Sequence, residues 1–216
     1  MKNNLAIFLD FDGTILDNLP QMYLAYEDFM NDIGQKPSQE EFDEGNGVPL
    51  RESLNGMKKK YFLNDSVDYL ENKYHEFIAI RTVSVKPRHG FEFFLDKEFS
   101  KGKKISIVSS NRNDVIKGWL EKYNLSSYIS FICSSESVKN GKPNAEPYIT
   151  AMKQLEVSPS HCIAIEDSCL GVLSSTNAGI QTIQIINKTG SLNAPSELAS
   201  NVVNNFDEIQ YIVDAI

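Results

Sequence analysis

The apolar positions of this chain follow two different periodicities along its length. Leu5 to Leu9 form a short continuous apolar run, which is typical of a buried parallel strand. Beyond that run, to about residue 83, apolar residues recur every three or four positions, the spacing of one helix face. The first such series consists of Leu19, Met22, Tyr23, Tyr26, Phe29, Met30 and Ile33. Residues 17–83 are therefore predicted to be entirely helical.

Local signals mark the limits of these helices. Gly34 follows the first series at the place of a C-terminal cap, where glycine readily adopts left-handed backbone angles. Ser38 and Glu41 have the spacing of a capping box, so a short helix is expected to begin there and to end near Gly45. A further helix is expected over residues 65–81.

After Pro87 the pattern changes to single helices that alternate with short apolar strands. The predicted strands are residues 104–108, 129–133, 162–165 and 180–186, and the predicted helices are 90–99, 114–123, 145–155 and 168–177. Strands separated by single helices indicate βαβ units and a parallel sheet. The predicted fold class is α/β, with a core built from residues 1–16 and 84–216 and an all-helical insertion at 17–83. Residues 187–205, which are rich in Asn, Ser and Thr, are expected to form a loop.

The composition limits the partners and the compartment of the protein. The 21 Lys and Arg against 29 Asp and Glu give a formal net charge of -8, which disfavours nucleic acid and anionic membranes as partners. No apolar run approaches the roughly 18 residues of a membrane span. The three cysteines, Cys133, Cys162 and Cys169, lack the spacing of metal ligands and fit a reducing compartment. We expect a cytoplasmic protein that is a monomer or a weak dimer.

Chemically active side chains follow the predicted strands of the core. These side chains are Asp10, Asp12, Ser109, Ser110, Lys142, Glu166 and Asp167. In an open parallel sheet the ligands bind outside the carboxyl ends of the strands. Acids, hydroxyls and a lysine from distant segments are therefore expected to converge at one edge of the sheet.

Each of these residue types has a role if the ligand is a phosphate bound with a hard cation. Asp10 and Asp12 leave the same face of an extended chain, so one can attack phosphorus while the other transfers protons. These carboxylates and Asp167 repel one another unless a cation lies between them, and Mg²⁺ prefers oxygen ligands. Thr14 and the two serines offer hydroxyl and N–H groups to the phosphate, and Lys142 offers a positive charge. A D-x-D-G-T segment alone could equally be a turn after a strand.

In this combination and order, the segments resemble the motifs of the haloacid dehalogenase-like hydrolase superfamily. The matching segments are Asp10-Phe11-Asp12-Gly13-Thr14, Ser109, Lys142-Pro143 and Glu166-Asp167-Ser168. The resemblance covers nearly the whole chain. It implies a Rossmann-like catalytic core with a helical cap domain inserted after the first motif, and the stretch 17–83 matches such a cap.

The same resemblance implies a role for each matching residue. Asp10 would be the nucleophile that forms an aspartyl-phosphate, and also a Mg²⁺ ligand. Asp12 would be the general acid/base, with its backbone carbonyl on the metal. Asp167 would be a metal ligand, and Glu166 would bind the metal directly or lie just outside its ligand sphere. Ser109 and Lys142 would bind the phosphoryl group.

The expected reaction is Mg²⁺-dependent hydrolysis of a phosphomonoester, with phosphoglycolate or a sugar phosphate as the substrate. A phosphosugar mutase that resembles β-phosphoglucomutase is the nearest alternative, but Ile15 to Tyr23 lack the threonine and histidine that such mutases carry. Hydrolysis of a phosphonate would need an amine in the cap, for which the run Lys58 to Lys60 is available. A non-catalytic module that binds a phosphorylated ligand or a protein partner through the cap also stays open.

The cap contains a segment, Gly45 to Arg51, that resembles the substrate-specificity loop of phosphoglycolate-phosphatase-like members. Gly47 and Arg51 are the candidate specificity residues. Arg51 can meet a second anionic group on the substrate, or it can be an ordinary arginine at a helix start. The expected partner is a small phosphorylated metabolite.

Overall fold

The computed structural model of the chain describes residues 5–45, 48–186 and 194–216. The chain divides into two compact units. The α/β unit comprises Met1–Asp17 and Lys86–Ile216, and the helical unit comprises Asn18–Val85. The α/β unit is thus discontinuous in sequence, because the helical unit interrupts it after its first strand.

Within the described residues, the α/β unit contains one six-stranded parallel sheet with the strand order β3-β2-β1-β4-β5-β6. The strands are β1 (Ala6–Leu9), β2 (Lys104–Val108), β3 (Phe131–Cys133), β4 (Cys162–Glu166), β5 (Gln181–Ile185) and β6 (Asn201–Val203). The chain begins at the centre with β1, moves outwards to β3, and returns to the centre with β4 before it moves outwards on the other side. The prediction of an α/β fold with a parallel sheet is confirmed.

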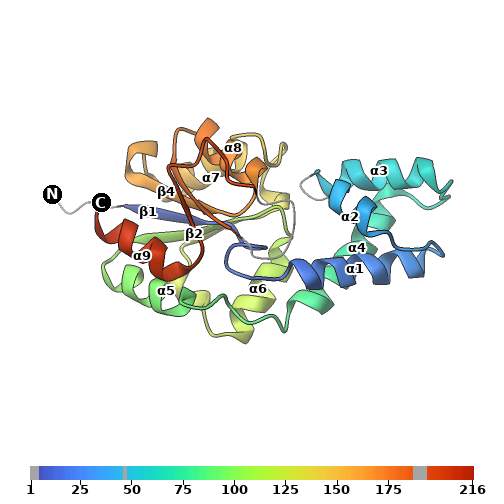
Figure 1. The fold of residues 1–216 in the computed structure, drawn as a ribbon, viewed down its shortest axis with the longest axis horizontal. Helices are drawn as coiled ribbons and strands as arrows, with labels where there is room; N and C mark the ends of the chain where they lie inside the picture. The colour runs from blue at the N-terminus through green and yellow to red at the C-terminus, as the bar shows by residue number, and fades with distance from the viewer. Residues whose placement is uncertain (1–4, 46–47, 187–193) are drawn as a thin grey trace. The chain divides into compact units, whose positions relative to one another are not determined.

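Helices cover both faces of this sheet (Figure 1). They are α5 (Phe91–Ser100), α6 (Asn113–Lys122), α7 (Glu146–Leu155), α8 (Cys169–Asn177) and α9 (Phe206–Asp214), with short 3₁₀ turns at Ser126–Tyr128, Ser135–Ser137 and Pro159–His161. Helices α7 and α8 lie over one face, and α5, α6 and α9 lie over the other. Parallel connections are almost always right-handed, so the reversal of chain direction between β3 and β4 moves the helices to the opposite face.

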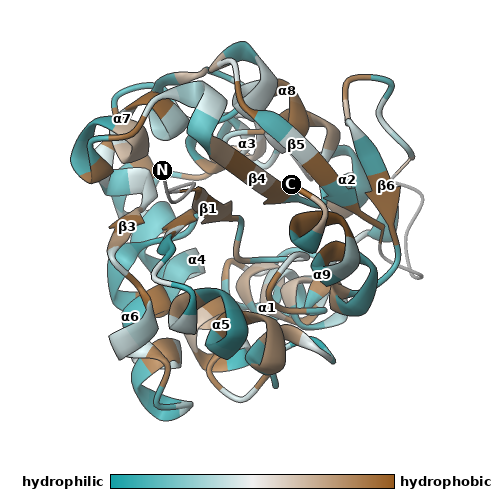
Figure 2. Cartoon of the chain, turned by 90° about the vertical axis from the view of Figure 1, so that its left-hand side faces the viewer, coloured by the Kyte–Doolittle hydropathy of each residue, from teal (hydrophilic) through white to brown (hydrophobic). Residues whose placement is uncertain are grey.

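The central strands are the most deeply buried part of the α/β unit. Every residue of β1 and of β4 is buried, and both strands are strongly hydrophobic in Figure 2. Because helices lie on both faces of the sheet, both sides of a central strand avoid water, which explains the continuous apolar run at the start of the sequence. The rings of Phe8 on β1 and Tyr148 on α7 pack edge to face, with their centroids 6.2 Å apart.

The far end of the sheet differs from the prediction. The interpretation of residues 187–205 as a loop is wrong for Asn201–Val203, which form β6 and pair in parallel with β5. A strand of three residues next to Asn204 and Asn205 has too short an apolar run to be visible in the sequence. Helix α9 follows in a segment to which the sequence pattern assigns no element, and it covers the sheet with Phe206, Ile209 and Val213.

The described part of the helical unit consists of helices that pack around their own core. They are α1 (Leu19–Asp32), α2 (Gln39–Gly45), α3 (Leu50–Lys60) and α4 (Val67–Thr82). The buried members of this core are Ala25, Tyr26, Phe29, Met30, Leu54, Met57, Leu70, Tyr74 and Ile78. Tyr26, Phe29 and Met30 on α1 belong to the predicted apolar series, whereas Ala25 does not. The helical prediction for this stretch is confirmed.

The predicted helix signals are visible in the backbone of this unit. Gly34 has a φ of +73° just after α1, the left-handed angle expected of a C-terminal cap. The main-chain N–H of Glu41 donates to the hydroxyl of Ser38 at 3.3 Å, as expected for the start of α2. Arg81 near the end of α4 forms a forked ion pair with Asp28 of α1, with N–O distances of 2.7 and 2.9 Å.

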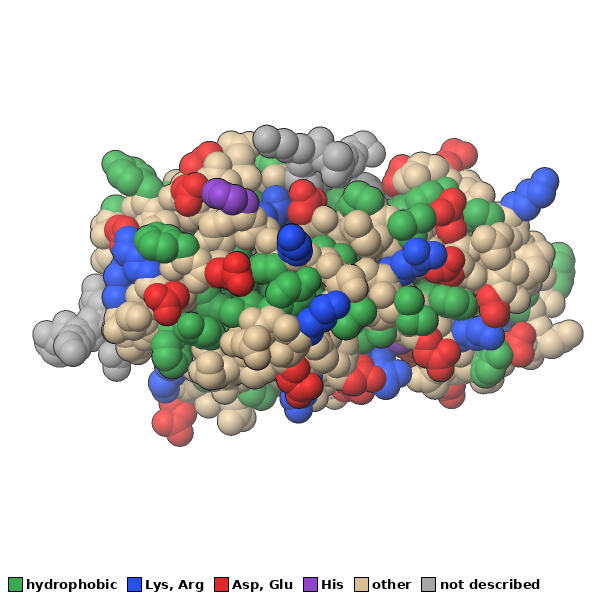
Figure 3. Space-filling model, turned by 90° about the horizontal axis from the view of Figure 1, so that it is seen from below, with side chains coloured by type: hydrophobic (Ala, Val, Ile, Leu, Met, Phe, Trp, Pro, Cys, Tyr) green, Lys and Arg blue, Asp and Glu red, His purple; other side chains and the backbone are tan. Residues whose placement is uncertain are grey.

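Acidic and basic side chains are mixed on the face of the molecule shown in Figure 3, without a broad area of one sign. Across the part of the chain that the structure describes, no helix combines the length and the apolar character that a membrane span requires.

Candidate active site

The carboxyl ends of β1 and β4 lie side by side at the point where the chain reverses its direction along the sheet. Leu9 at the end of β1 pairs with Ile165 of β4, and the main-chain N–H of Asp10 donates to the carbonyl of Ile165 at 3.0 Å. On its other side β1 pairs with β2, which ends at Val108. Ligands of open parallel sheets bind in the crevice at such a reversal. The loops that follow these strands therefore bring their side chains to one place.

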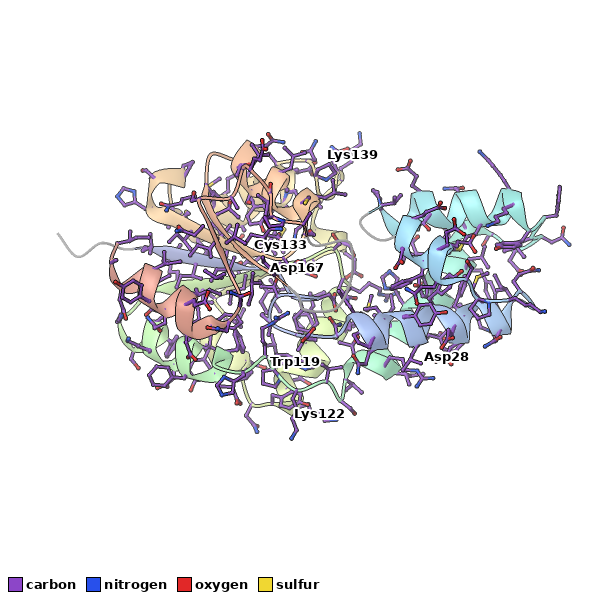
Figure 4. The ribbon with its side chains drawn as sticks, in the orientation of Figure 1. Asp28, Trp119, Lys122, Cys133, Lys139 and Asp167 are labelled. Carbon is purple, nitrogen blue, oxygen red and sulfur yellow. The ribbon has the colours of Figure 1, made fainter. Side chains whose placement is uncertain are left out.

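The side chain of Lys142 contacts residues at the carboxyl ends of three strands, β1, β2 and β4. Its Nζ lies 2.6 Å from Oδ1 of Asp10 and 2.5 Å from Oε1 of Glu166, and it donates to the carbonyl of Val108 at 2.8 Å. Burial lowers the pKa of Lys142, but the two carboxylates raise it more, so the ammonium keeps its charge. The neighbouring Lys139 projects from the surface of the unit, whereas Asp167 lies inside it (Figure 4).

Glu166 is held by protein groups from several sides. Its Oε1 pairs with Lys142 and accepts a hydrogen bond from the phenol of Tyr148. The other carboxylate oxygen, Oε2, lies against Gly171, where a Cβ atom would overlap the carboxyl group. Gly171 stands in the first turn of α8, and its N–H donates to the hydroxyl of Ser168 at 3.0 Å. The glycine thus leaves the space that the buried carboxyl group fills.

Replacing Gly171 by alanine is therefore expected to destabilise the protein and to disturb the carboxyl group beside it. The methyl group would displace Glu166 and, through it, Lys142, and overpacking of this kind costs about 1–3 kcal/mol. Urea denaturation measures the loss of stability.

Gly118→Ala in α6 is the matched control, because a Cβ at that position would meet no side chain and no backbone outside the adjacent turns of its own helix within 4 Å. Alanine in a helix is more favourable than glycine, so this control should gain about 0.5–1 kcal/mol. If both alanine variants were equally stable, the account of Gly171 would be wrong.

The carboxylates of Asp10, Glu166 and Asp167 form a buried cluster, in which one oxygen from each residue lies within 4.8 Å of the others. Burial raises the pKa of Asp167 well above its ordinary value, and the negative charges of Asp10 and Glu166 raise it further. Lys142 alone does not balance three carboxylates. A divalent cation among these oxygens would supply the missing positive charge, and oxygen ligands of this type suit Mg²⁺.

Asp12 is half-buried, and its carboxylate is oriented by Asn111. Nδ2 of Asn111 donates to Oδ2 of Asp12 at 2.9 Å. Asn111 is fixed in turn, because its Oδ1 accepts from the N–H of Arg112 at 2.8 Å and its own N–H donates to Oγ of Ser109 at 3.0 Å. The side chain of Asp12 is therefore held from the end of β2.

The predicted phosphate-binding hydroxyls differ in their surroundings. Ser109 is buried at the end of β2, whereas Ser110 is exposed. Thr14 is fully buried, and its Oγ1 forms no hydrogen bond with any residue that the structure describes. A buried hydroxyl without a partner is costly, so this group is well suited to receive a ligand oxygen.

Sequence reasoning did not assign a role to Asn111, Tyr148 or Arg88. Asn111 belongs to the Ser-Ser-Asn segment after a predicted strand, so its place at the sheet edge could have been recognised. Tyr148 falls among the apolar positions of a helix and gives no sequence signal. Arg88, whose Nη2 donates to the carbonyl of Gly13 at 2.6 Å, lies about seventy-five residues further along the chain and gives none either.

The predicted specificity residues of the helical unit stay predictions. Gly47 lies outside the described residues. Arg51 at the start of α3 is exposed, and its guanidinium pairs with Asp68 at 2.5 Å and with Glu71 at 2.6 Å. An anionic substrate group would have to compete with these two carboxylates for Arg51.

Comparisons with known proteins show which proteins the chain is similar to. The family model described as haloacid dehalogenase-like hydrolase matches residues 7–185. A phosphorylated carbohydrates phosphatase of Thermotoga maritima is 27% identical over 183 residues, which cover 82% of this chain and 83% of that protein. A phosphoglycolate phosphatase of Aquifex aeolicus is 26% identical over 182 residues, or 82% of each chain. The crystal structure of a β-phosphoglucomutase from Clostridium difficile is similar with a TM-score of 0.80 and 24% identity, and the match covers 97% of this chain and 95% of that chain.

Proposed function

The chain belongs to the haloacid dehalogenase-like hydrolase family, and we propose that this phosphatase uses Mg²⁺ and a covalent aspartyl-phosphate on Asp10 to hydrolyse a small phosphorylated metabolite. The observation that carries the proposal is the buried junction of Asp10, Lys142, Glu166 and Asp167 at the reversal point of the sheet. It combines a nucleophile, a fixed positive charge and a set of oxygen ligands for a cation. The relatives that are named phosphatases support the same reaction.

The reaction proceeds in two displacements at phosphorus. A carboxylate oxygen of Asp10 attacks the phosphorus, the P–O bond to the substrate alcohol breaks, and Asp12 gives its proton to the departing oxygen. Asp12, now a carboxylate, takes a proton from a water molecule, whose oxygen attacks the aspartyl-phosphate. The bond between phosphorus and the carboxylate oxygen of Asp10 then breaks. This releases inorganic phosphate and restores the carboxylate of Asp10 and the protonated Asp12.

The surrounding residues orient these groups. Lys142 neutralises one charge beside Asp10 and is placed to bind the phosphoryl group, while Asn111 directs the carboxylate of Asp12. The N–H groups after β2 and the hydroxyls of Ser109 and Thr14 would accommodate the oxygens of the phosphate. Ser110 is exposed and would contribute mainly through its main chain.

The residues present fit a divalent cation. Asp10 and Asp167 would hold it with their carboxylates and Asp12 with its main-chain carbonyl. Glu166 would act from outside the ligand sphere, since its Oε1 is engaged by Lys142 and Tyr148. When bound, Mg²⁺ supplies positive charge that shields the phosphate from the carboxylate that attacks it.

Removal of divalent metal is therefore expected to abolish hydrolysis. We expect the rate with p-nitrophenyl phosphate to fall by at least about a hundredfold in excess chelator and to return when Mg²⁺ is added above the chelator concentration. Undiminished hydrolysis in excess chelator would exclude the metal role. The test requires only the unaltered protein and an absorbance assay.

The substrate is best sought with a panel of phosphorylated metabolites that includes phosphoglycolate and several sugar phosphates. Release of inorganic phosphate with one of them supports the phosphatase. Formation of an isomeric sugar phosphate would identify a mutase instead. If no substrate gives either product, the protein would be a non-catalytic module that binds a phosphorylated ligand.

A further inference from the structure

We propose that Arg88 is a positioning residue for the reaction, because it fixes the direction of the peptide group between Gly13 and Thr14. The inference rests on the proposed function, since it assigns Arg88 a task in the same site. Arg88 lies outside the four motif segments and does not belong to the carboxylate cluster. Its hydrogen bond to the site is made to the loop that follows Asp12.

The side chain of Arg88 is almost completely enclosed in the α/β unit, with 10% of its surface exposed. Its Nη2 donates to the carbonyl oxygen of Gly13 at 2.6 Å and lies 3.9 Å from Oδ1 of Asp17. Burial lowers the pKa of Arg88, and the negative charges of Asp17 and Asp167 oppose that effect. A guanidinium stays protonated under all ordinary conditions, so the carbonyl of Gly13 receives a charged donor.

The main chain at residue 88 holds the same loop. The N–H of Arg88 donates to the carbonyl of Ile15 at 2.8 Å, and Pro87 forms an isolated antiparallel β-bridge with Leu16. The segment that returns to the α/β unit is therefore bound to the segment that leaves it. This pairing places the Arg88 side chain opposite Gly13 in a defined position.

The hydrogen bond to Gly13 has a consequence for Thr14. The carbonyl of Gly13 and the N–H of Thr14 belong to one planar peptide group and point in opposite directions. A donor that fixes the carbonyl therefore fixes the N–H. Gly13 has a φ of +81°, so the backbone turns sharply here, and the orientation of the next peptide group would otherwise be poorly restrained.

A charged donor on the carbonyl also makes the N–H of the same peptide a stronger donor. The buried hydroxyl of Thr14, which has no partner among the described residues, belongs to the same residue as that N–H. Arg88 thus holds the N–H of Thr14, beside that hydroxyl, ready for an oxygen of the transferring phosphoryl group. Donors that are aligned before the reaction stabilise the transition state more than the substrate.

The test compares Arg88→Ala, Arg88→Lys and unaltered protein in the hydrolysis of p-nitrophenyl phosphate at saturating Mg²⁺. We expect kcat of Arg88→Ala to fall by about 30- to 100-fold while KM changes by less than about threefold, since a misdirected donor mainly affects the transition state. Arg88→Lys retains the positive charge but lacks the planar guanidinium group. Its kcat should lie between that of Arg88→Ala and that of the unaltered protein. Added guanidinium chloride, well below concentrations that unfold the protein, should restore part of kcat to Arg88→Ala, and sodium chloride should not.

Arg81→Ala is the matched control, because it removes an arginine that also forms a close pair, with Asp28, within the helical unit. Its kcat should stay within about twofold of the unaltered protein. Thermal melting distinguishes positioning from a purely structural role. A loss of kcat in Arg88→Ala that accompanies a lower melting temperature and is not rescued by guanidinium would overturn the inference, as would an unchanged kcat.

A measurement without turnover separates this inference from the proposed function. Orthovanadate mimics a phosphoryl group, and we expect it to bind Arg88→Ala about tenfold more weakly than unaltered protein in the presence of Mg²⁺. Equal affinity would overturn the role of Arg88 even if no hydrolysis is found. Conversely, tight binding that depends on Arg88 without hydrolysis of any phosphomonoester would refute the proposed function and keep the role of Arg88.

Discussion

Replacing Asp10 by asparagine is expected to reduce phosphomonoester hydrolysis by at least about a thousandfold. The amide has nearly the size of the carboxylate, but its oxygen is a poor nucleophile for phosphorus. Lys142 keeps its ion pair with Glu166 in this variant, so the variant should remain folded. Its inactivity would therefore result from the missing nucleophile.

One measurement and one control variant make this result decisive. Rapid quenching during turnover followed by mass spectrometry should detect a phosphoryl group on unaltered protein and none on Asp10→Asn. Asp96→Asn is the control, because Asp96 is an exposed aspartate of α5 that hydrogen-bonds only weakly to Tyr128, at 3.3 Å. If Asp10→Asn were as active as Asp96→Asn, a covalent intermediate on Asp10 would be excluded.

Replacing Lys142 by methionine is expected to affect both stability and catalysis. The methionine fills similar space but leaves Asp10 and Glu166 buried without their ammonium partner. Removing one partner of a buried ion pair costs about 3–5 kcal/mol. Hydrolysis should fall by at least about a hundredfold, since the phosphoryl group also loses a charged ligand.

The pH dependence of Lys142→Met follows from the same charges. Without the ammonium, the pKa values of Glu166 and Asp167, which burial already raises above those of the unfolded chain, rise further. The folded state then binds more protons than the unfolded state, so the stability of the variant increases as the pH falls toward the ordinary range of carboxyl groups. Denaturation at several pH values checks this, with Lys139→Met as the exposed control, which should stay within about 0.5 kcal/mol of the unaltered protein. If the loss of stability in Lys142→Met relative to the unaltered protein did not change with pH, the electrostatic explanation would be contradicted.

Most of the sheet could be predicted because its signals are local. The run from Leu5 to Leu9 is apolar at every position, as expected where helices cover both faces, and the alternation after Pro87 indicates the parallel order. Because the carboxyl ends of parallel strands lie at one edge of the sheet, residues that follow these strands are predicted to lie close together even when they are far apart in sequence. The pairing of Lys142 with Asp10, which are 132 residues apart, is a contact of this kind.

Other features depend on tertiary contacts that no local pattern encodes. Tyr148 donates a hydrogen bond to Glu166 from the buried face of α7, whose other residues are apolar, so the sequence gives no sign that its hydroxyl has a polar partner. The need for glycine at position 171 becomes visible only once the carboxyl group beside it is placed. Strand β6 is defined by its pairing with β5 and not by the composition of its three residues.

The interrupted α/β unit also determines the order in which this protein can fold during synthesis. Strand β1 leaves the ribosome long before one of its two neighbours, β4, which ends only at Glu166. The intervening helical unit ends at Val85 and has its own apolar core, so it can fold while β1 is still unpaired because β2 and β4 have not yet been synthesised. An apolar segment that stays unpaired for so long is a natural target for chaperones that bind nascent chains.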